Sequence, residues 1–298
     1  MTSVLIILRQ LITMFLYMGI GAVLFRKGFV TREGSRSMAN VLLYAVMPSV
    51  VVQSFCVERT PEKTHALLVS VGVAAVLMLL SMLLARLLCR DPLDVFGVTF
   101  ANAGFMGFPL VTAVLGGDAI FYATGFVALV NVLQWTYGQL LISGDRRYCD
   151  PRDLIKNPLI LSVLVGVLIF FLQPPIPALV QTTLAGLSAL NGPLAMLVLG
   201  VYLAQTDLRK LFTTPHLYRV SAVRLVVIPL LSVLLLRLLP AEYDAIRATL
   251  AIVVSAPVGS NVAVYAQRLD KDYTYAVQIV CLCTILSLLT MPLMLLLI

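Results

Sequence analysis

FANAGFMGFPL, residues 100–110, interrupts an otherwise apolar run that extends over about residues 95–115. Pro109 has no backbone donor and clashes with the carbonyl group four residues earlier, and the two glycines before it weaken a helix further. Asn102 adds an amide to the same short segment. Unpaired backbone groups are costly in lipid, so a break survives only where it lines a cavity or packs on protein. The stretch therefore predicts a membrane helix that is broken near its centre.

A second stretch has the same character. SAPVGSN, residues 255–261, lies inside the apolar run 246–266 and again combines proline, glycine and small polar residues. Two interrupted spans at corresponding places in the two halves of a chain are typical of a transporter's binding site. The sequence therefore predicts that these two stretches build one site.

Composition places the chain in the membrane. Of the 298 residues, 60% are hydrophobic and 12% are charged, whereas about 25% are charged in a typical soluble domain. The net charge of +7 fits basic loops at a membrane surface, and no basic face indicates nucleic-acid binding. The spacing of the five cysteines predicts neither a disulfide framework nor a metal site. The two histidines, His65 and His216, are expected in separate loops.

Ten membrane spans fit the hydropathy pattern, which predicts an all-α polytopic membrane protein. A first set of five (1–142) and a second set of five (158–298) flank a polar connecting loop (143–157). The ten predicted spans cover residues 4–25, 38–57, 66–88, 95–115, 119–142, 158–173, 179–204, 217–239, 246–267 and 274–297.

Charge in the loops predicts the orientation. Most of the 21 Lys and Arg residues fall after odd-numbered spans, in the groups 26–36, 86–90, 146–156, 209–224 and 268–271. Arg224 is counted with the loop residues of the fourth group. By the positive-inside rule this side is cytoplasmic, so both termini of a multi-pass protein of the plasma (inner) membrane are expected outside.

The prolines indicate an internal repeat. Pro48 and Pro193 are 145 residues apart, and Pro109 and Pro257 are 148 residues apart. Each half holds five spans, and an odd number of spans makes the second copy enter the membrane with the opposite topology. The two similar offsets therefore favour two inverted five-helix repeats.

The breaks supply the candidate binding groups. The N-terminal end of a half-helix presents unpaired N–H groups and a partial positive charge, which attract carboxylates without Lys or Arg. For the polar side chains, hydrogen bonding between helices is the competing interpretation, and it is an equally good one for Asn131, Gln134, Asn191 and Gln278. The predicted substrate-binding residues are Asn102, Gly104, Met106, Gly107, Pro109, Asn191, Ser255, Pro257, Gly259, Ser260 and Asn261, with Pro48, Asn131, Gln134 and Gln278 as secondary candidates.

No set of residues indicates an enzyme, a metal site or a cofactor. The spans hold no paired aspartates, no His/Glu zinc pair and no glycine-rich phosphate loop with lysine. No Asp or Glu is expected near the centre of the fourth or ninth span, which argues against coupling through a carboxylate. Sodium can also bind through carbonyls and amides, so coupling to Na⁺ or H⁺ stays open.

Residues 102–110 look like the fourth-span motif of the auxin efflux carrier family, which includes the plant PIN carriers and bacterial organic-acid permeases. The pattern begins with Asn102 and continues as Met-Gly-x-Pro-Leu at 106–110. Residues 256–266 are similar to the family's ninth span, and 190–200 resemble its seventh. The resemblance covers essentially the whole chain in order and spacing.

This resemblance implies a fold of two inverted five-span repeats, related to the bile-acid/sodium symporters. The broken fourth and ninth helices would cross within a transporter domain made of helices 3–5 and 8–10. Helices 1, 2, 6 and 7 would form a scaffold, through which a homodimer is expected. The short connecting loop fits a bacterial organic-anion carrier better than an auxin carrier.

The resulting hypothesis is a secondary carrier that moves a small organic anion through the bilayer by elevator-type or rocking alternation. A ligand-binding or sterol-binding sensor with a carrier fold stays open, as does a sodium-coupled symporter. A channel and a membrane enzyme have less support, because no ring of charges and no catalytic set is visible.

Overall fold

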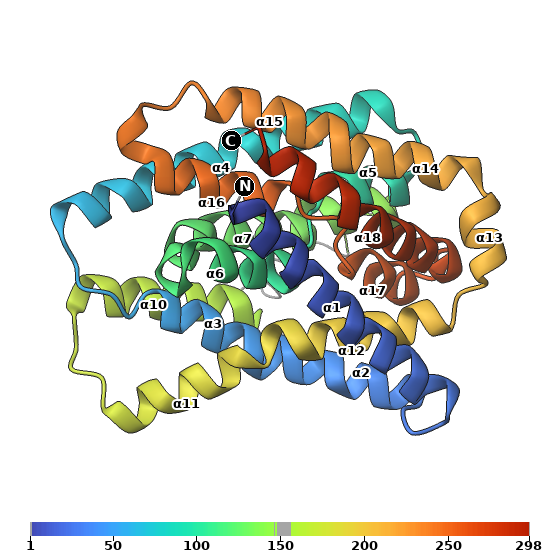
Figure 1. Ribbon diagram of the computed structural model, residues 1–298, viewed down its shortest axis with the longest axis horizontal. Helices are drawn as coiled ribbons and strands as arrows, with labels where there is room; N and C mark the ends of the chain where they lie inside the picture. The colour runs from blue at the N-terminus through green and yellow to red at the C-terminus, as the bar shows by residue number, and fades with distance from the viewer. Residues whose placement is uncertain (1, 146, 148–155, 298) are drawn as a thin grey trace.

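The computed structural model describes residues 2–145, 147 and 156–297, and every element named in these ranges is a helix (Figure 1). Most of the connecting loop predicted at 143–157 lies outside the described residues, as does Cys149. The predicted all-α class is confirmed for the described chain.

Up to residue 145, the described chain contains eight α-helices and four short η elements, of which η3 is a 3₁₀ turn and the others are π-helical turns. They are α1 (Thr2–Arg26), α2 (Arg32–Val41), η1 (Leu42–Val46), α3 (Met47–Ser54), α4 (Pro61–Leu88), α5 (Pro92–Thr99), η2 (Ala103–Gly107), α6 (Phe108–Leu115), η3 (Gly117–Ala119), α7 (Ile120–Leu133), η4 (Gln134–Gly138) and α8 (Gln139–Ser143).

The described second half begins at α10 and contains one further π-helical turn, η6, and one further 3₁₀ turn, η7. Its elements are α10 (Pro158–Leu172), α11 (Ala178–Ala189), α12 (Asn191–Ala204), α13 (Leu208–Thr213), α14 (Pro215–Ala222), η6 (Val223–Val227), α15 (Ile228–Leu236), η7 (Ala241–Tyr243), α16 (Asp244–Val254), α17 (Asn261–Arg268) and α18 (Tyr273–Leu295).

Seven helical stretches of the described chain are long and apolar enough to cross a membrane. Each corresponds to one of the ten predicted spans. The predicted sixth span is the shorter helix Pro158–Leu172, and the predicted fourth and ninth spans are each divided into two shorter helical pieces. The seven long stretches are Leu5–Arg26, Arg32–Ser54, Pro61–Leu88, Gly117–Ser143, Ala178–Ala204, Pro215–Leu236 and Tyr273–Met294.

Several helices begin at a cap residue followed by proline, and the local sequence explains why they start there. Thr60 accepts a hydrogen bond from the backbone N–H of Lys63, and Pro61 is the first helical residue of α4. Asn157 accepts from the backbone N–H groups of Leu159 and Ile160 at the start of α10. A cap side chain pairs an otherwise free N–H, and proline at the first position has no N–H to leave unpaired.

The π-helical turns explain how three spans tolerate an internal proline. Pro48, Pro109 and Pro229 each lie two residues after the end of a π-helical turn, namely η1, η2 and η6. Proline removes one intrahelical hydrogen bond and crowds the carbonyl four residues earlier. The wider turn before the proline relieves this crowding, so these helices continue past it.

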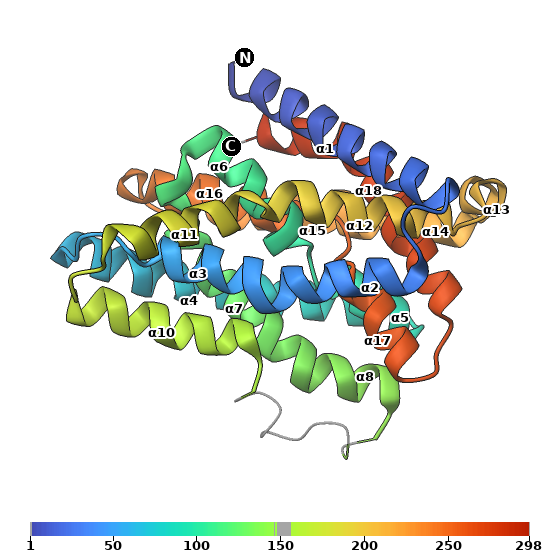
Figure 2. The same cartoon turned by 90° about the horizontal axis from the view of Figure 1, so that it is seen from below.

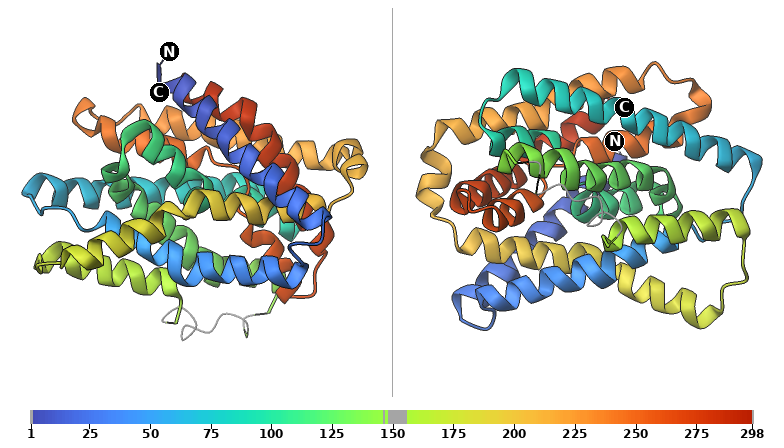
Figure 3. Two further views of the ribbon diagram at one scale, coloured as in Figure 1. Left: turned by 60° about the horizontal axis from the view of Figure 1, so that its bottom comes forward. Right: turned by 180° about the vertical axis from the view of Figure 1, so that it is seen from behind.

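Helix α1 lies at one edge of the molecule, where it packs along α12, while α8 and α10 lie at the opposite edge (Figure 2). Two glycines allow this close approach. A Cβ atom at Gly200 would lie 2.0 Å from the Met18 carbonyl oxygen, and one at Gly21 would lie 2.2 Å from the Leu197 carbonyl oxygen. Small residues commonly bring membrane helices together in this way. The two ends of the chain lie near each other on one side (Figure 3).

Two expectations about where the chain is helical are wrong. The first interruption lies at residues 100–102, before the glycines and Pro109 that were expected to cause it, because the π-helical turn η2 absorbs those residues. The histidines are helical rather than in loops, since His65 belongs to α4 and His216 to α14.

Candidate functional site

The two interrupted spans meet through their backbones. Ala101 and Val258 form an isolated antiparallel bridge. The N–H of Asn102 donates to the Pro257 carbonyl at 2.8 Å, and the N–H of Gly259 donates to the Phe100 carbonyl at 2.9 Å. Each break therefore satisfies backbone groups that the other leaves free, as a segment inside an apolar environment requires.

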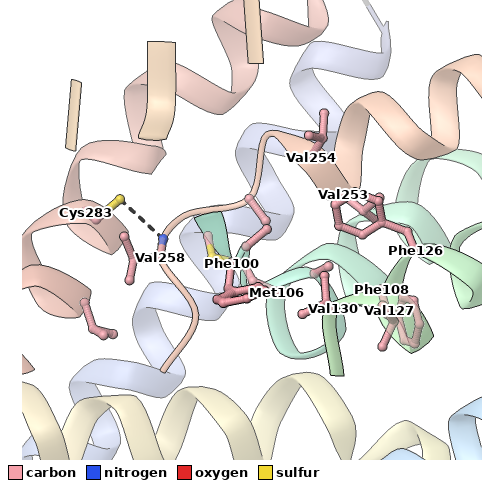
Figure 4. Packing of buried hydrophobic residues seen from close by; sticks show 14 of the residues in the cluster. Phe100, Met106, Phe108, Phe126, Val127, Val130, Val253, Val254, Val258 and Cys283 are labelled. Carbon is pink, nitrogen blue, oxygen red and sulfur yellow. Dashed lines mark hydrogen bonds between the residues drawn. The ribbon is translucent and has the colours of Figure 1, made fainter. Parts of the chain in front are cut away.

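Gly259 permits this pairing. A Cβ atom there would lie 3.2 Å from the Phe100 carbonyl oxygen and 3.4 Å from that of Ala101. On the opposite side of the paired segment, the buried Cys283 thiol accepts a hydrogen bond from the N–H of Val258 at 3.4 Å (Figure 4). The paired segment is thus enclosed on both sides by close packing.

A small cavity of about 40 Å³ lies directly beside the paired breaks. At this volume it holds about one water molecule. Its lining comes from both interrupted spans, from α7 and η4, and from one residue each of η1, α3 and α10. The predicted site residues in this lining are Asn102, Gly104, Asn131, Gln134, Gly259, Ser260 and Asn261.

The amides around this cavity differ in what they bind. Asn131 donates to the Val127 carbonyl of its own helix at 2.8 Å. Asn261 donates to the Gln134 side-chain oxygen at 2.8 Å, which joins α17 to η4. Asn102 is 4% exposed, and within the described chain its side-chain nitrogen has no hydrogen-bond partner. Asn102 therefore offers a buried donor to a ligand, whereas Asn131 already uses its donor within its helix.

Asn102 also stands where a helix begins. It precedes η2, and the first N–H groups of a helix have no acceptor within that helix. Helix α17 begins near the same cavity, at Asn261. Two helix N-terminal ends thus contribute partial positive charge to one small volume.

Asn191 connects the start of α12 to the first break. Its side-chain nitrogen donates to the Gly104 carbonyl at 2.9 Å, and its side-chain oxygen lacks a partner among the described residues. The adjacent Gly192 packs closely on Pro109, since a Cβ atom there would lie 3.2 Å from the proline ring. Helix α12 therefore contacts the interrupted span through both polar and close apolar contacts.

The remaining predicted residues are not gathered around the small cavity. Asn191 and Pro109 line a separate cavity of about 660 Å³. Ser255 is buried, and its hydroxyl group has no partner in the described part of the chain, but it does not line the small cavity. The last group lines none of the three cavities described here: Met106, Gly107, Pro257, Pro48 and Gln278.

Two large cavities lie at opposite ends of the helical stretch Arg32–Ser54, which contains α2 and α3, and of α12. The cavity of about 620 Å³ is lined by the start of α2 and the end of α12, and the 660 Å³ cavity by the end of α3 and the start of α12. Only the 620 Å³ cavity shares lining residues with the small one: Leu43, Phe105, Ser260 and Asn261. We call it the basic cavity, because Arg32, Arg36 and Arg268 also line it.

Two buried charged residues, Arg224 and Asp94, lie inside the helical bundle although the sequence pattern does not predict them there. Arg224, which was counted with the loop residues, is 0% exposed and lies in the middle of the stretch Pro215–Leu236. Its position inside an apolar run was a signal that could have identified it. Asp94 is 1% exposed. The predicted fourth span begins at residue 95, one residue too late to include Asp94.

Asp94 joins three helices near one end of the bundle. Its Oδ2 atom lies 2.6 Å from the Nε2 atom of His216, and its Oδ1 atom accepts a hydrogen bond from the Tyr275 hydroxyl at 2.6 Å. Cys89 lies close by in the connection before α5. Burial, together with the charge of Asp94, raises the pKa of the Cys89 thiol to about 11. This cluster ties α5, α14 and α18 to one another.

The class of protein defined by these features is a membrane transporter, and comparison with known proteins agrees. A family model described as "Membrane transport protein" matches residues 6–295. The chain belongs to this family, and the predicted membership of the auxin efflux carrier family is confirmed.

Two relatives are similar over most of their lengths. An "Uncharacterized transporter" of Methanothermobacter thermautotrophicus is 28% identical over 293 residues, which cover 92% of this chain and 92% of the relative. A protein of Rhizobium meliloti named "Putative malonate transporter" is 27% identical over 270 residues, covering 84% of this chain and 82% of the relative.

Proposed function

We propose that this protein is a secondary carrier of small organic anions, with carboxylates such as dicarboxylates as the substrate class. The observation that carries the proposal is the buried, unpaired side-chain nitrogen of Asn102, which lines the small cavity between the two breaks. A carboxylate there would accept a hydrogen bond from this amide and face two helix N-terminal ends. The name of the Rhizobium meliloti relative supports the same class.

The topology we propose has ten spans arranged as two inverted five-helix repeats, 1–142 and 158–298. The fourth and ninth spans cross at residues 100–102 and 255–260, where the antiparallel bridge between Ala101 and Val258 supports the crossing. Helices 3–5 and 8–10 form the transporter domain. Helices 1, 2, 6 and 7 form the scaffold and the interface of a homodimer.

The cavities support alternating access. The small cavity holds about one water molecule, so a dicarboxylate requires movement of the breaks relative to the scaffold. The shared residues Ser260 and Asn261 make the basic cavity the open route in this conformation. We place its arginines on the cytoplasmic side of the plasma membrane by the positive-inside rule, with both termini outside.

Uptake into proteoliposomes tests the function. We expect the purified protein to transport radiolabelled malonate or a related dicarboxylate with saturable kinetics and to exchange it for the unlabelled anion. Runs with sodium, with choline and with an imposed proton gradient identify the driving ion. Saturable binding without uptake would instead assign the protein as a sensor, and conversion of the anion would assign an enzyme.

A further inference from the structure

Arg224 is a cation enclosed by the protein. It belongs to the π-helical turn η6, in the middle of the stretch Pro215–Leu236, and it is 0% exposed. Burial of an unpaired charge is strongly unfavourable, so a buried guanidinium requires compensation from its surroundings.

The compensation comes from backbone carbonyls. The Nε atom of Arg224 donates to the Ala256 carbonyl at 3.0 Å, and Nη1 donates to the Val98 carbonyl at 3.1 Å. Nη2 donates to the Val254 carbonyl. The ion pairs found within the described residues all involve other basic groups. The guanidinium therefore binds carbonyl oxygens from both interrupted spans.

Two of these three carbonyls belong to helix ends. Val98 lies in the last turn of α5, and Val254 is the last residue of α16. Each helix C-terminal end carries roughly half a negative charge. Two such ends together amount to about one negative charge, which the single positive charge of Arg224 balances.

The three hydrogen bonds of Arg224 lie where both breaks begin. The bridge between Ala101 and Val258 follows within a few residues of each helix end. One side chain on a third span thus fixes the separation and direction of the two half-helices before their backbones pair. Without the Arg224 side chain, the partial negative charges of carbonyl oxygens from the two helix ends would face an empty space. Carbonyl oxygens arranged in this way bind small cations in membrane transporters.

We infer that Arg224 is a positioning residue that serves as a built-in cation for the paired breaks, in the place of a bound metal ion. The breaks therefore keep their geometry without sodium. The inference concerns the ends of α5 and α16 that precede the breaks, so it does not depend on the identity of the transported anion.

Chemical rescue tests this inference. The Arg224→Ala variant is expected to have a lower melting temperature than the wild type, measured on purified protein in detergent. Millimolar guanidinium chloride should restore much of the loss, because a ligand of the folded state stabilises it by mass action. Urea has a similar planar shape and no charge, so it serves as the matched control and should restore nothing. Equal effects of guanidinium and urea would overturn the inference.

Two further measurements decide the question if Arg224→Ala cannot be purified. Arg224→Lys keeps the charge and Arg224→Met keeps the approximate length, so the lysine variant should melt closer to the wild type than the methionine variant. Equal melting temperatures for the two variants would contradict a role for the charge. Replacing choline by sodium at equal ionic strength should raise the melting temperature of Arg224→Met more than that of the wild type, because only the variant leaves the carbonyls without a cation. An equal response of the two proteins would contradict the built-in cation.

Discussion

The close contact between α1 and α12 predicts that adding one methyl group, by a glycine-to-alanine substitution at the contact, lowers the stability of the protein. The Cβ atom of Gly200→Ala would lie 2.0 Å from the Met18 carbonyl oxygen, and that of Gly21→Ala would lie 2.2 Å from the Leu197 carbonyl oxygen. An ordinary contact begins at about 3.4 Å, so each variant must separate the two backbones by roughly 1.2–1.4 Å. Backbone atoms cannot rotate away as a side chain can.

We expect each of these two variants to be less stable by about 1–2 kcal/mol. Overpacking costs about 1–3 kcal/mol, and the better helix propensity of alanine returns up to about 1 kcal/mol. Gly19 on the same helix provides the control, because a Cβ atom there meets nothing within 4 Å. Gly19→Ala should therefore be neutral or slightly stabilising.

The assay is thermal unfolding of the three purified variants in one detergent, followed by intrinsic fluorescence. The melting temperature should fall for Gly21→Ala and Gly200→Ala and should stay level or rise for Gly19→Ala. If all three variants shift by the same amount in the same direction, the proposed close packing of α1 on α12 is refuted.

Three other contacts can be tested in the same preparation. Asn261→Ala and Gln134→Ala should be non-additive by about 0.5–1 kcal/mol in a double-mutant cycle, because each removes the same 2.8 Å hydrogen bond; additive effects would contradict it. Asp94→Asn should destabilise the protein by about 1–3 kcal/mol, since a buried acceptor of two contacts is altered; an unchanged melting temperature would show that the cluster is not stabilising. Cys89, whose pKa is raised to about 11, should react slowly with a maleimide at pH 8 and faster as the pH approaches 11, because only the thiolate reacts; fast reaction at pH 8 would show an exposed or acidic thiol.

The sequence predicted which segments are interrupted because interruption is a local property. Proline, glycine and small polar residues inside an apolar run oppose a regular helix wherever they occur. The exact position of the first break could not be predicted in this way. Pro109 is accommodated by the π-helical turn before it, and the chain is extended at residues 100–102 because those residues pair with Pro257–Gly259. That pairing is a contact between segments far apart in the chain.

The polar candidates show the same limit. The sequence ranks Asn102 and Asn261 together above Asn131 as binding residues. Only the three-dimensional contacts separate the free donor of Asn102 from the donors of Asn131 and Asn261, which are already bonded. Arg224 was misassigned because basic residues near span ends usually belong to loops. Its carbonyl partners lie 30 to 126 residues away in sequence, so a local sequence pattern cannot predict them.

The central claim is that a carboxylate binds at the buried donor of Asn102, and affinity for malonate in purified variants tests it most directly. Asn102→Ala removes the donor and should weaken binding by about 10- to 100-fold, as expected for a hydrogen bond to a charged group. Asn102→Asp keeps the shape but adds a negative charge, so it should weaken binding further. Ser81→Ala, which removes a buried hydroxyl bonded within α4, should leave the affinity unchanged. Wild-type affinity in both Asn102 variants would contradict the account.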